Sequence, residues 1–127
     1  ILMITHDDVG TALLNTVLKL LGGLPLPTIA IPINHDIDPE ISCQRLRTII
    51  QNIHNTDGVL ILTDVFGATP NNIVLELQNE INVKVITGLN LPMLIKVMNY
   101  PDLSLSLLAE KAICGGREGV VNCEEMN

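Results

Sequence analysis

The sequence predicts an α/β fold, in which one doubly wound, mainly parallel sheet carries helices on both of its faces. Two observations lead to this prediction. Short apolar runs typical of buried strands alternate with segments whose apolar residues recur every three or four positions, as they do in helices. Brief loops join these segments, and strand–helix alternation of this kind builds parallel sheets. With 127 residues, the chain is expected to form one domain over residues 1–127.

The first two predicted strands differ in their expected place in the sheet. Ile1–Thr5 is an apolar run that leads directly into a helical pattern over residues 8–21. Thr28–Ile33 is the second strand, and it contains Pro32. Because proline has no N–H to donate to a neighbouring strand, this second strand is expected at an edge of the sheet.

The middle of the chain predicts a second helix, a central strand and a third helix. Asp38 suits the N-cap and Pro39 the first position of a helix that ends before Asp57. Val59–Leu62 is the most hydrophobic stretch, as expected for a strand covered on both faces. Thr69-Pro70 predicts the start of the third helix.

The last part of the chain predicts two strands and two helices. Val83–Thr87 is expected to be the fourth parallel strand, followed by a helix over Pro92–Met98. A last helix spans about Ser104–Cys114, and Gly115-Gly116 is expected to end it. Gly119–Asn122 is predicted as a short C-terminal edge strand.

The predicted topology indicates where the polar ends of the strands meet. Right-handed crossovers and the edge position of the second strand favour the strand order 2-1-3-4. Strands one and three are then neighbours, and ligands of open α/β sheets bind outside the carboxyl ends of such strands. His6, after the first strand, and Asp64, after the third, are therefore expected to share one crevice.

The composition argues against several classes of partner. Fourteen acidic against seven basic residues give a formal charge of −7, which disfavours nucleic acid because phosphate backbones attract Lys and Arg. The apolar runs are far shorter than the roughly 20 residues of a membrane-spanning helix. Cys43, Cys114 and Cys123 lack metal-site spacing and are expected to be reduced thiols in a cytoplasmic protein. The sequence has no phosphate-binding glycine loop, and no cofactor is expected.

His6 and Asp64 suit phosphoryl transfer through a phosphohistidine. The Asp64 carboxylate can accept a hydrogen bond from one ring nitrogen, which fixes the tautomer and leaves the other nitrogen as nucleophile. At a helix start, the N–H groups of Gly67, Ala68 and Thr69 and the Thr69 hydroxyl can donate to phosphoryl oxygens. Such a transfer needs mainly alignment and charge stabilisation, so no metal is expected.

Each of these residues also has a plainer interpretation. A histidine at a strand end is usually a polar terminus, Asp64 can cap a turn, and Thr69 can cap a helix without any ligand. The functional interpretation therefore rests on the convergence of three suitable groups from two segments. His35, near Asp36 and Asp38, could be a metal ligand, but a solvated loop explains it better because no compact ligand spacing is present.

Four motifs resemble those of a known family: Ile4-Thr5-His6, Leu62-Thr63-Asp64-Val65-Phe66-Gly67-Ala68-Thr69-Pro70-Asn71-Asn72, Thr87-Gly88-Leu89-Asn90-Leu91-Pro92-Met93-Leu94 and Gly116-Arg117-Glu118-Gly119-Val120. In matching order over essentially the whole chain, they resemble the IIA components of the mannose/fructose/sorbose family. These proteins belong to the bacterial phosphoenolpyruvate-dependent sugar phosphotransferase system.

This resemblance implies a phosphotransferase that works through a phosphohistidine. His6 would accept a phosphoryl group from the histidine-containing phosphocarrier protein and pass it to a IIB component. Asp64 would be the supporting carboxylate and Thr69 the phosphate-contacting hydroxyl. The resemblance also implies a homodimer, in which Gly119–Asn122 can pair with the partner's sheet, and at most peripheral contact with a membrane sugar permease.

One departure from the family concerns the residues after the histidine. The family commonly has Gly there, whereas this chain has Asp7-Asp8. Like charge beside a phosphorylated ring is unfavourable, although Asp8 can instead cap the following helix. The departure leaves the choice between sugar uptake and a regulatory branch of the system open.

The main alternative is a response-regulator receiver phosphorylated on Asp64. Asp7-Asp8 and Thr87 also fit that template, but it needs a Lys at the end of a fifth strand, and Lys111 falls within a helical pattern. It also leaves His6 unexplained. A regulatory interaction domain without phosphotransfer is a further alternative. A flavin carrier is disfavoured, because aromatic residues are nearly absent.

Overall fold

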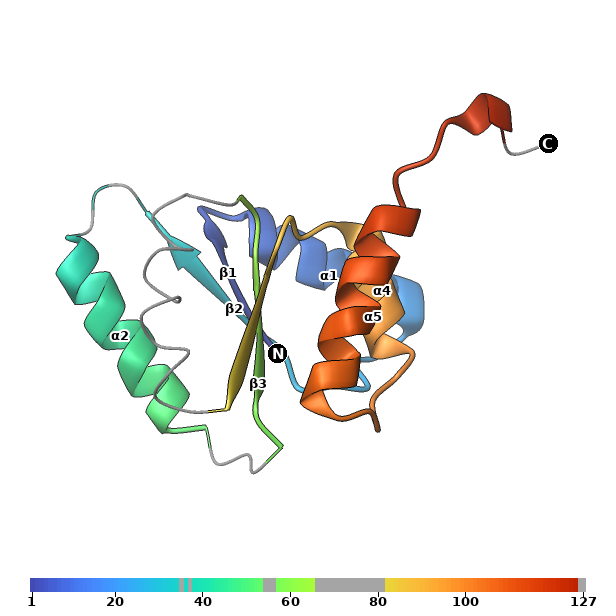
Figure 1. The fold of residues 1–127 in the computed structure, drawn as a ribbon. Helices are drawn as coiled ribbons and strands as arrows, with labels where there is room; N and C mark the ends of the chain where they lie inside the picture. Colours follow the sequence, from blue (N-terminus) through green and yellow to red (C-terminus); the bar gives the residue numbers. More distant parts are fainter. Residues whose placement is uncertain (35, 37, 54–56, 66–81, 126–127) are drawn as a thin grey trace.

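A computed structural model of the chain describes residues 1–34, 36, 38–53, 57–65 and 82–125 (Figure 1). In chain order the described elements are β1 (Leu2–His6), α1 (Val9–Leu21), β2 (Ile29–Ile33), α2 (Pro39–Gln51), β3 (Val59–Thr63), β4 (Val83–Thr87), α4 (Leu91–Met98), α5 (Leu105–Glu118) and a short 3-10 helix, η1 (Cys123–Glu125). The helix predicted to start at Thr69 lies outside the described residues.

The four described strands form one parallel sheet in the order β2-β1-β3-β4, which confirms the predicted topology. β1 lies between β2 and β3, and its Ile4 is opposite both Ile31 and Thr63. β3 is buried along its whole length, whereas β2, which contains Pro32, lies at an edge. The carboxyl ends of β1 and β3 therefore lie side by side.

Helices cover both faces of this sheet (Figure 1). On one face, Leu46 and Ile50 of α2 pack in a cluster with alternate strand residues such as Ile4 and Ile61. On the other face, α1, α4 and α5 bury a second aliphatic cluster around Leu62. Burying one such side chain stabilises the fold by about 1.5–3 kcal/mol. Together the two clusters hold the strands, and so the ends of β1 and β3, in register.

Helix α5 is longer than the sequence predicted. Gly115 and Gly116, which were expected to end it, lie inside the helix, and it continues to Glu118. A Cβ atom on Gly115 would lie 2.4 Å from the Cβ atom of Lys96 on α4. The two helices therefore approach too closely to leave room for a side chain at this position, and the glycine serves packing rather than termination.

The predicted C-terminal edge strand is not formed. Gly119–Asn122 instead leads away from the body of the molecule towards η1 (Figure 1). Val120 and Val121 are 79% and 55% exposed. A strand exists only where a neighbouring strand shares its backbone hydrogen bonds, and no described strand of this single chain pairs with the segment.

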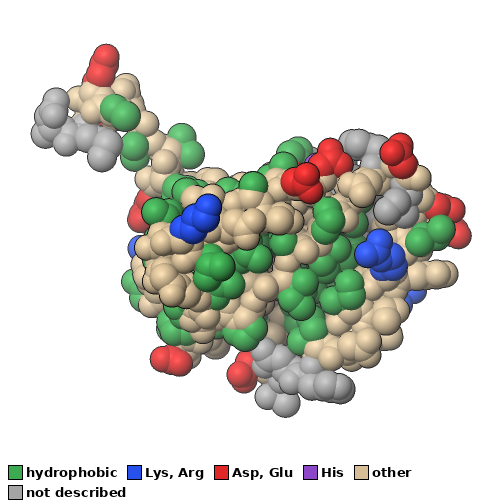
Figure 2. Space-filling model, turned by 180° about the vertical axis from the view of Figure 1, so that it is seen from behind, with side chains coloured by type: hydrophobic (Ala, Val, Ile, Leu, Met, Phe, Trp, Pro, Cys, Tyr) green, Lys and Arg blue, Asp and Glu red, His purple; other side chains and the backbone are tan. Residues whose placement is uncertain are grey.

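Hydrophobic side chains also reach the surface. Figure 2 shows them spread across the face opposite to the view of Figure 1. Exposed large hydrophobic residues of α1 and β2 include Leu18, Leu20, Leu21 and Ile29. Within the part of the chain that the structure describes, no helix is both long and apolar enough to cross a membrane.

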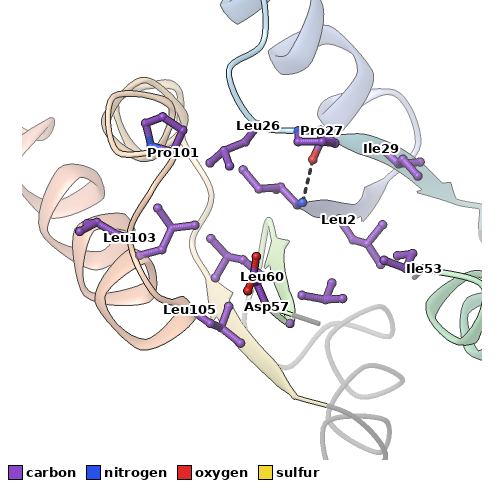
Figure 3. Close-up of a pocket in the computed structure, with 14 residues that line it drawn as sticks. Leu2, Leu26, Pro27, Ile29, Ile53, Asp57, Leu60, Pro101, Leu103 and Leu105 are labelled. Carbon is purple, nitrogen blue, oxygen red and sulfur yellow. Dashed lines mark hydrogen bonds between the residues drawn. The ribbon is translucent and has the colours of Figure 1, made fainter. Parts of the chain in front are cut away.

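An apolar cavity of about 190 Å³ opens at the amino-terminal edge of β1 and β3 (Figure 3). Its lining includes Leu2, Leu60, Pro101 and Leu105. Asp57 is the one ionisable side chain among its described lining residues. The cavity therefore presents few side chains that could act as an acid, a base or a nucleophile. The polar strand ends lie at the opposite edge of the sheet.

Candidate functional site

His6 is the last residue of β1 and stands at the carboxyl edge of the sheet. Leu2–Thr5 before it are buried, whereas the His6 side chain is 27% exposed. Only Asp7 and Asp8 separate it from α1. Asp7 has a φ of 42°, a left-handed conformation that Asp adopts more readily than most residues. Its N–H donates to the backbone oxygen of Ile33 in β2 at 3.2 Å, which ties the turn after His6 to the neighbouring strand.

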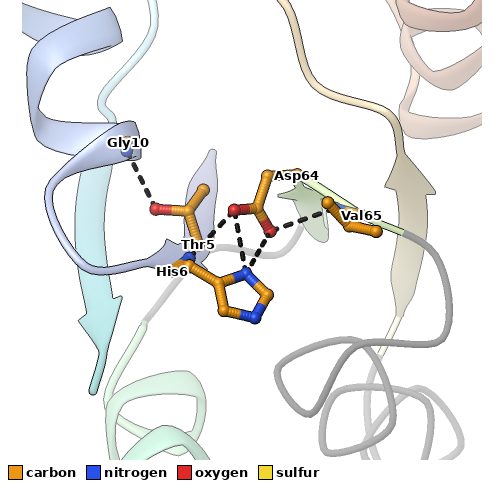
Figure 4. A network of polar contacts seen from close by, with 5 residues as sticks. All are labelled: Thr5, His6, Gly10, Asp64 and Val65. Carbon is orange, nitrogen blue, oxygen red and sulfur yellow. Dashed lines mark hydrogen bonds and ion pairs between the residues drawn. The ribbon is translucent and has the colours of Figure 1, made fainter. Parts of the chain in front are cut away.

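Asp64 directly follows β3, and its carboxylate meets His6 (Figure 4). The Oδ2 atom accepts the backbone N–H of His6 at 3.0 Å and lies 3.0 Å from Nδ1 of the ring. The Oδ1 atom lies 3.2 Å from Nδ1 and accepts the N–H of Val65 at 3.0 Å. One carboxylate therefore binds both the backbone and the ring of His6, where the sheet topology predicted that the two residues would meet.

The electrostatics of this contact fix the tautomer of the ring. The Asp64 side chain is 11% exposed, and burial by itself would raise its pKa. Hydrogen bonds from the His6 backbone and ring, together with the attraction between the carboxylate and a protonated ring, outweigh burial and hold the pKa of Asp64 below its ordinary value. An ionised carboxylate only accepts hydrogen bonds, so Nδ1 carries the proton in the neutral ring. Nε2 then carries the lone pair and points away from Asp64 (Figure 4).

Other residues singled out from the sequence are placed elsewhere or not described. The predicted phosphate contacts Gly67, Ala68 and Thr69 lie outside the described residues, as does His35. Asp38 caps α2 with its side chain, as predicted. Among the residues with described positions, no group of three or more His, Cys, Asp or Glu side chains could hold a metal ion.

Thr5 is a residue of the site whose role was not predicted from the sequence. It is 1% exposed, and its Oγ1 atom accepts the N–H of Gly10, in the first turn of α1, at 2.8 Å. Asp8, which was expected to cap this helix, occupies the N-cap position, but its side chain makes no capping hydrogen bond. In the sequence Thr5 belongs to the Ile4-Thr5-His6 motif, but a threonine five positions before a glycine is too unspecific a pattern to predict the contact.

This arrangement equips His6 to act as a nucleophile or a general base. Asp64 occupies the Nδ1 side of the ring, so a reactant approaches at Nε2. A positive charge that forms on the ring is stabilised by the carboxylate on the other side. The geometry therefore suits the transfer of a group to and from Nε2.

Comparisons with solved structures find the same fold in sugar phosphotransferase components. The mannose/sorbose-specific IIA subunit from Enterococcus faecalis is similar with a TM-score of 0.86 and 20% identity, over 95% of this chain and 91% of that one. The component EIIA from Streptococcus agalactiae is similar with a TM-score of 0.83 and 24% identity, over 97% and 95%. A sigma-54 interaction domain protein from Enterococcus faecalis shares the fold with a TM-score of 0.74 and 18% identity, over 93% and 89%.

At the level of sequence, no curated protein matches the chain. A family does match, under the description PTS system fructose IIA component, and the match covers residues 1–112. It includes both strands that carry His6 and Asp64. The chain therefore belongs to the mannose/fructose-type IIA family, the phosphotransfer components of the sugar phosphotransferase system.

Proposed function

We propose that the chain is a phosphocarrier domain in which His6 accepts a phosphoryl group from the histidine-containing phosphocarrier protein and passes it to a IIB component. The observation that carries this proposal is the contact between Nδ1 of His6 and the Asp64 carboxylate at 3.0 Å. This contact supplies a fixed tautomer, a nucleophilic Nε2 and a negative charge behind the ring, which are what a phosphohistidine requires.

The chemistry follows from this geometry. Nε2 of neutral His6 attacks the phosphorus of the donor's phosphohistidine, so that a new P–N bond forms while the donor's P–N bond breaks. The electron pair of the broken bond returns to the donor's imidazole. The His6 ring then carries positive charge, which Asp64 stabilises through the hydrogen bond from Nδ1. Gly67, Ala68 and Thr69 are proposed to donate hydrogen bonds to the phosphoryl oxygens, and the reverse sequence delivers the group to the IIB component.

We also propose a homodimer, which acts in the cytoplasm and meets the membrane permease at most peripherally. Two observations support the dimer. The exposed Val120 and Val121 leave the body of the molecule, and β4 is the last strand of the described sheet. A groove of about 510 Å³ runs beside β4. Its lining includes Val85, Ile86, Thr87, Ile113, Arg117 and Val120.

A regulatory role for the same phosphohistidine is the second candidate. Asp7 and Asp8, both exposed, stand directly after His6, where they add like charge to a phosphorylated ring. Such a contact costs about 1 kcal/mol per charge in water. The shared fold of the sigma-54 interaction domain protein is compatible with this role. The phosphorylated state of His6 would then be a signal rather than an intermediate of sugar uptake.

The contacts of Asp64 disfavour the receiver alternative. Its two oxygens already accept hydrogen bonds from His6 and Val65. Lys111, the one candidate for the receiver's lysine, lies in α5 with its Nζ atom 4.5 Å from the centroid of the Tyr100 ring. Within the described residues, these contacts favour a supporting role for Asp64 over the role of phosphoryl acceptor.

The proposal is tested by labelling. The purified chain is incubated with labelled phosphoenolpyruvate and the general enzymes of the phosphotransferase system, without a IIB component. We expect the label on His6, its absence in His6→Ala, and its retention in His54→Ala as the matched control. Label retained in His6→Ala would contradict the proposal.

The stability of the label separates the two phosphoryl acceptors. A phosphohistidine survives alkali and is lost in acid, whereas an aspartyl phosphate is cleaved by hydroxylamine and needs Mg²⁺ to form. We therefore expect an acid-labile label that forms in the presence of EDTA when the labelled phosphocarrier protein, purified away from the enzyme that phosphorylates it, is the donor. A hydroxylamine-sensitive label would favour the receiver instead.

A further inference from the structure

We propose that Thr5 is a positioning residue for His6: its buried hydroxyl fastens the first turn of α1 to the end of β1 and thereby fixes the His6 ring against Asp64. This inference rests on the proposed function, because it concerns how the same histidine is held. It adds a residue that touches neither the ring nor a phosphoryl group.

The hydrogen bond of Thr5 replaces a helix cap. The first N–H groups of a helix have no partner within the helix and need one from outside. Asp8 at the N-cap supplies none with its side chain. The Thr5 hydroxyl, from within the preceding strand, accepts the N–H of Gly10 at 2.8 Å in a buried position (Figure 4). The helix therefore takes its cap from the residue next to His6.

The packing around this hydrogen bond leaves little freedom. A Cβ atom on Gly10 would lie 2.8 Å from Oγ1 and 3.3 Å from Cγ2 of Thr5, and 3.6 Å from Cβ of Met3. The backbone of α1 therefore rests directly on the side chains of β1. This close approach depends on a glycine at position 10, and it brings the Gly10 N–H to the Thr5 hydroxyl.

Three hydrogen bonds then fix the short turn that carries His6. The Gly10 N–H donates to Thr5 on the α1 side, the Asp7 N–H donates to Ile33 of β2 at 3.2 Å, and the His6 N–H donates to Asp64 at 3.0 Å. Only Asp7 and Asp8 lie between strand and helix, so a shift of α1 is passed to the peptide of His6. Because Asp64 binds both this peptide and the ring, the shift also changes the position of Nδ1.

The experiment compares two variants of Thr5 with a control helix cap. Thr5→Val keeps the shape but removes the acceptor, and Thr5→Ser keeps the acceptor. Ser104, whose hydroxyl caps α5 through the Leu107 N–H at 3.4 Å, gives the matched control Ser104→Ala. The first measurement is the ¹⁵N NMR shift of the His6 ring nitrogens, which reports the tautomer. The second is the single-turnover rate of phosphorylation, taken at a temperature where all variants are folded.

We expect Thr5→Val to show a mixture of ring tautomers and about a tenfold slower transfer, since misplacing a reacting group by an ångström costs up to about a hundredfold. Thr5→Ser should keep the tautomer and stay within about twofold of the wild-type rate. Ser104→Ala should lose stability without any change of tautomer or rate. If Thr5→Val is too unstable to purify, Gly10→Ala replaces it, because the added methyl group would displace the Thr5 hydroxyl. We expect the same mixture of tautomers and the same slower transfer.

Unchanged ring shifts and rate in Thr5→Val, or an equal loss of rate in Ser104→Ala, would overturn the positioning role. The tautomer measurement needs no phosphoryl donor. If the wild-type chain takes up no phosphoryl group, the proposed function fails, and the ring shifts alone still decide whether Thr5 holds His6.

Discussion

At the scale of single residues, the site depends on one carboxylate with two tasks. Asp64 accepts the backbone N–H of His6 and also faces Nδ1 of its ring. The first contact holds the strand end, and the second selects the tautomer. A substitution of Asp64 therefore affects both the position and the chemistry of the histidine.

Asp64→Asn should slow phosphorylation of His6 by at least about tenfold, because an amide can also donate to Nδ1 and so stabilise the wrong tautomer. The measurement is the rate of label transfer from the phosphocarrier protein. Asp102→Asn, which changes an exposed carboxylate outside the site, is the control and should leave the rate unchanged. Equal rates in all three proteins would contradict the supporting role of Asp64.

The lowered pKa of Asp64 predicts how stability depends on pH. Its folded pKa lies below the unfolded value, which is about 3.9 for Asp. The ionised carboxylate therefore adds stability that is fully present above that value and is lost as the pH falls through the folded pKa. Unfolding by urea at a series of pH values should show wild type losing its advantage over Asp64→Asn below about pH 4. A stability difference in favour of wild type that persists or grows below this pH would contradict the prediction.

The convergence of His6 and Asp64 could be predicted from the sequence because it depends only on strand order. Pro32 indicated the edge strand, and the edge strand fixed the order of the others. The contact of Thr5 with Gly10 could not be predicted in the same way. It depends on how closely helix α1 packs against strand β1. Side-chain packing in three dimensions decides this distance, and the periodicity of the sequence does not show it.

At the scale of elements, α4 and α5 show how glycine can mislead a prediction. Gly115-Gly116 suggested a helix end because glycine favours the left-handed conformation there. In the structure both residues are buried inside α5. The sequence does not show which of the two roles applies, because the side chain that excludes a Cβ atom at Gly115 belongs to Lys96 of α4, 19 residues earlier in the chain.

Gly115→Ala should lower the free energy of unfolding by about 1–3 kcal/mol, because the new methyl group overpacks the α4–α5 contact. Gly23→Ala is the matched control, since nothing lies within 4 Å of a Cβ atom there and a less flexible unfolded chain should leave it neutral or slightly more stable. Urea unfolding of both variants measures the difference. A stabilised Gly115→Ala would mean that the helices have room to separate.

At the scale of the whole molecule, the faces of the described sheet and its β4 edge differ in how they are covered. Helices cover its two faces, whereas β4 ends the sheet without a further described neighbour. The segment 119–122, which was predicted as a short edge strand, is not a strand in the single chain. Under the proposed homodimer, the segment would become a strand only by pairing with the sheet of the partner.

Truncation after Glu118 should therefore convert the proposed homodimer to a monomer, because it removes Val120 and Val121 from the interface. Sedimentation velocity at several protein concentrations measures the change. Leu20→Ser, which alters an exposed hydrophobic residue of α1, is the control and should remain dimeric. A monomeric full-length chain at high concentration would refute the dimer itself.

The turn between α4 and α5 lies beside the apolar cavity at the amino-terminal edge of the strands, with Pro101 and Asp102 exposed. His6 stands at the other end of β1. A fluorescent reporter inserted at this turn would therefore leave the His6–Asp64 contact intact, since exposed loop tips tolerate added sequence. Such a fusion would show where the protein lies in living cells without altering the residues around His6.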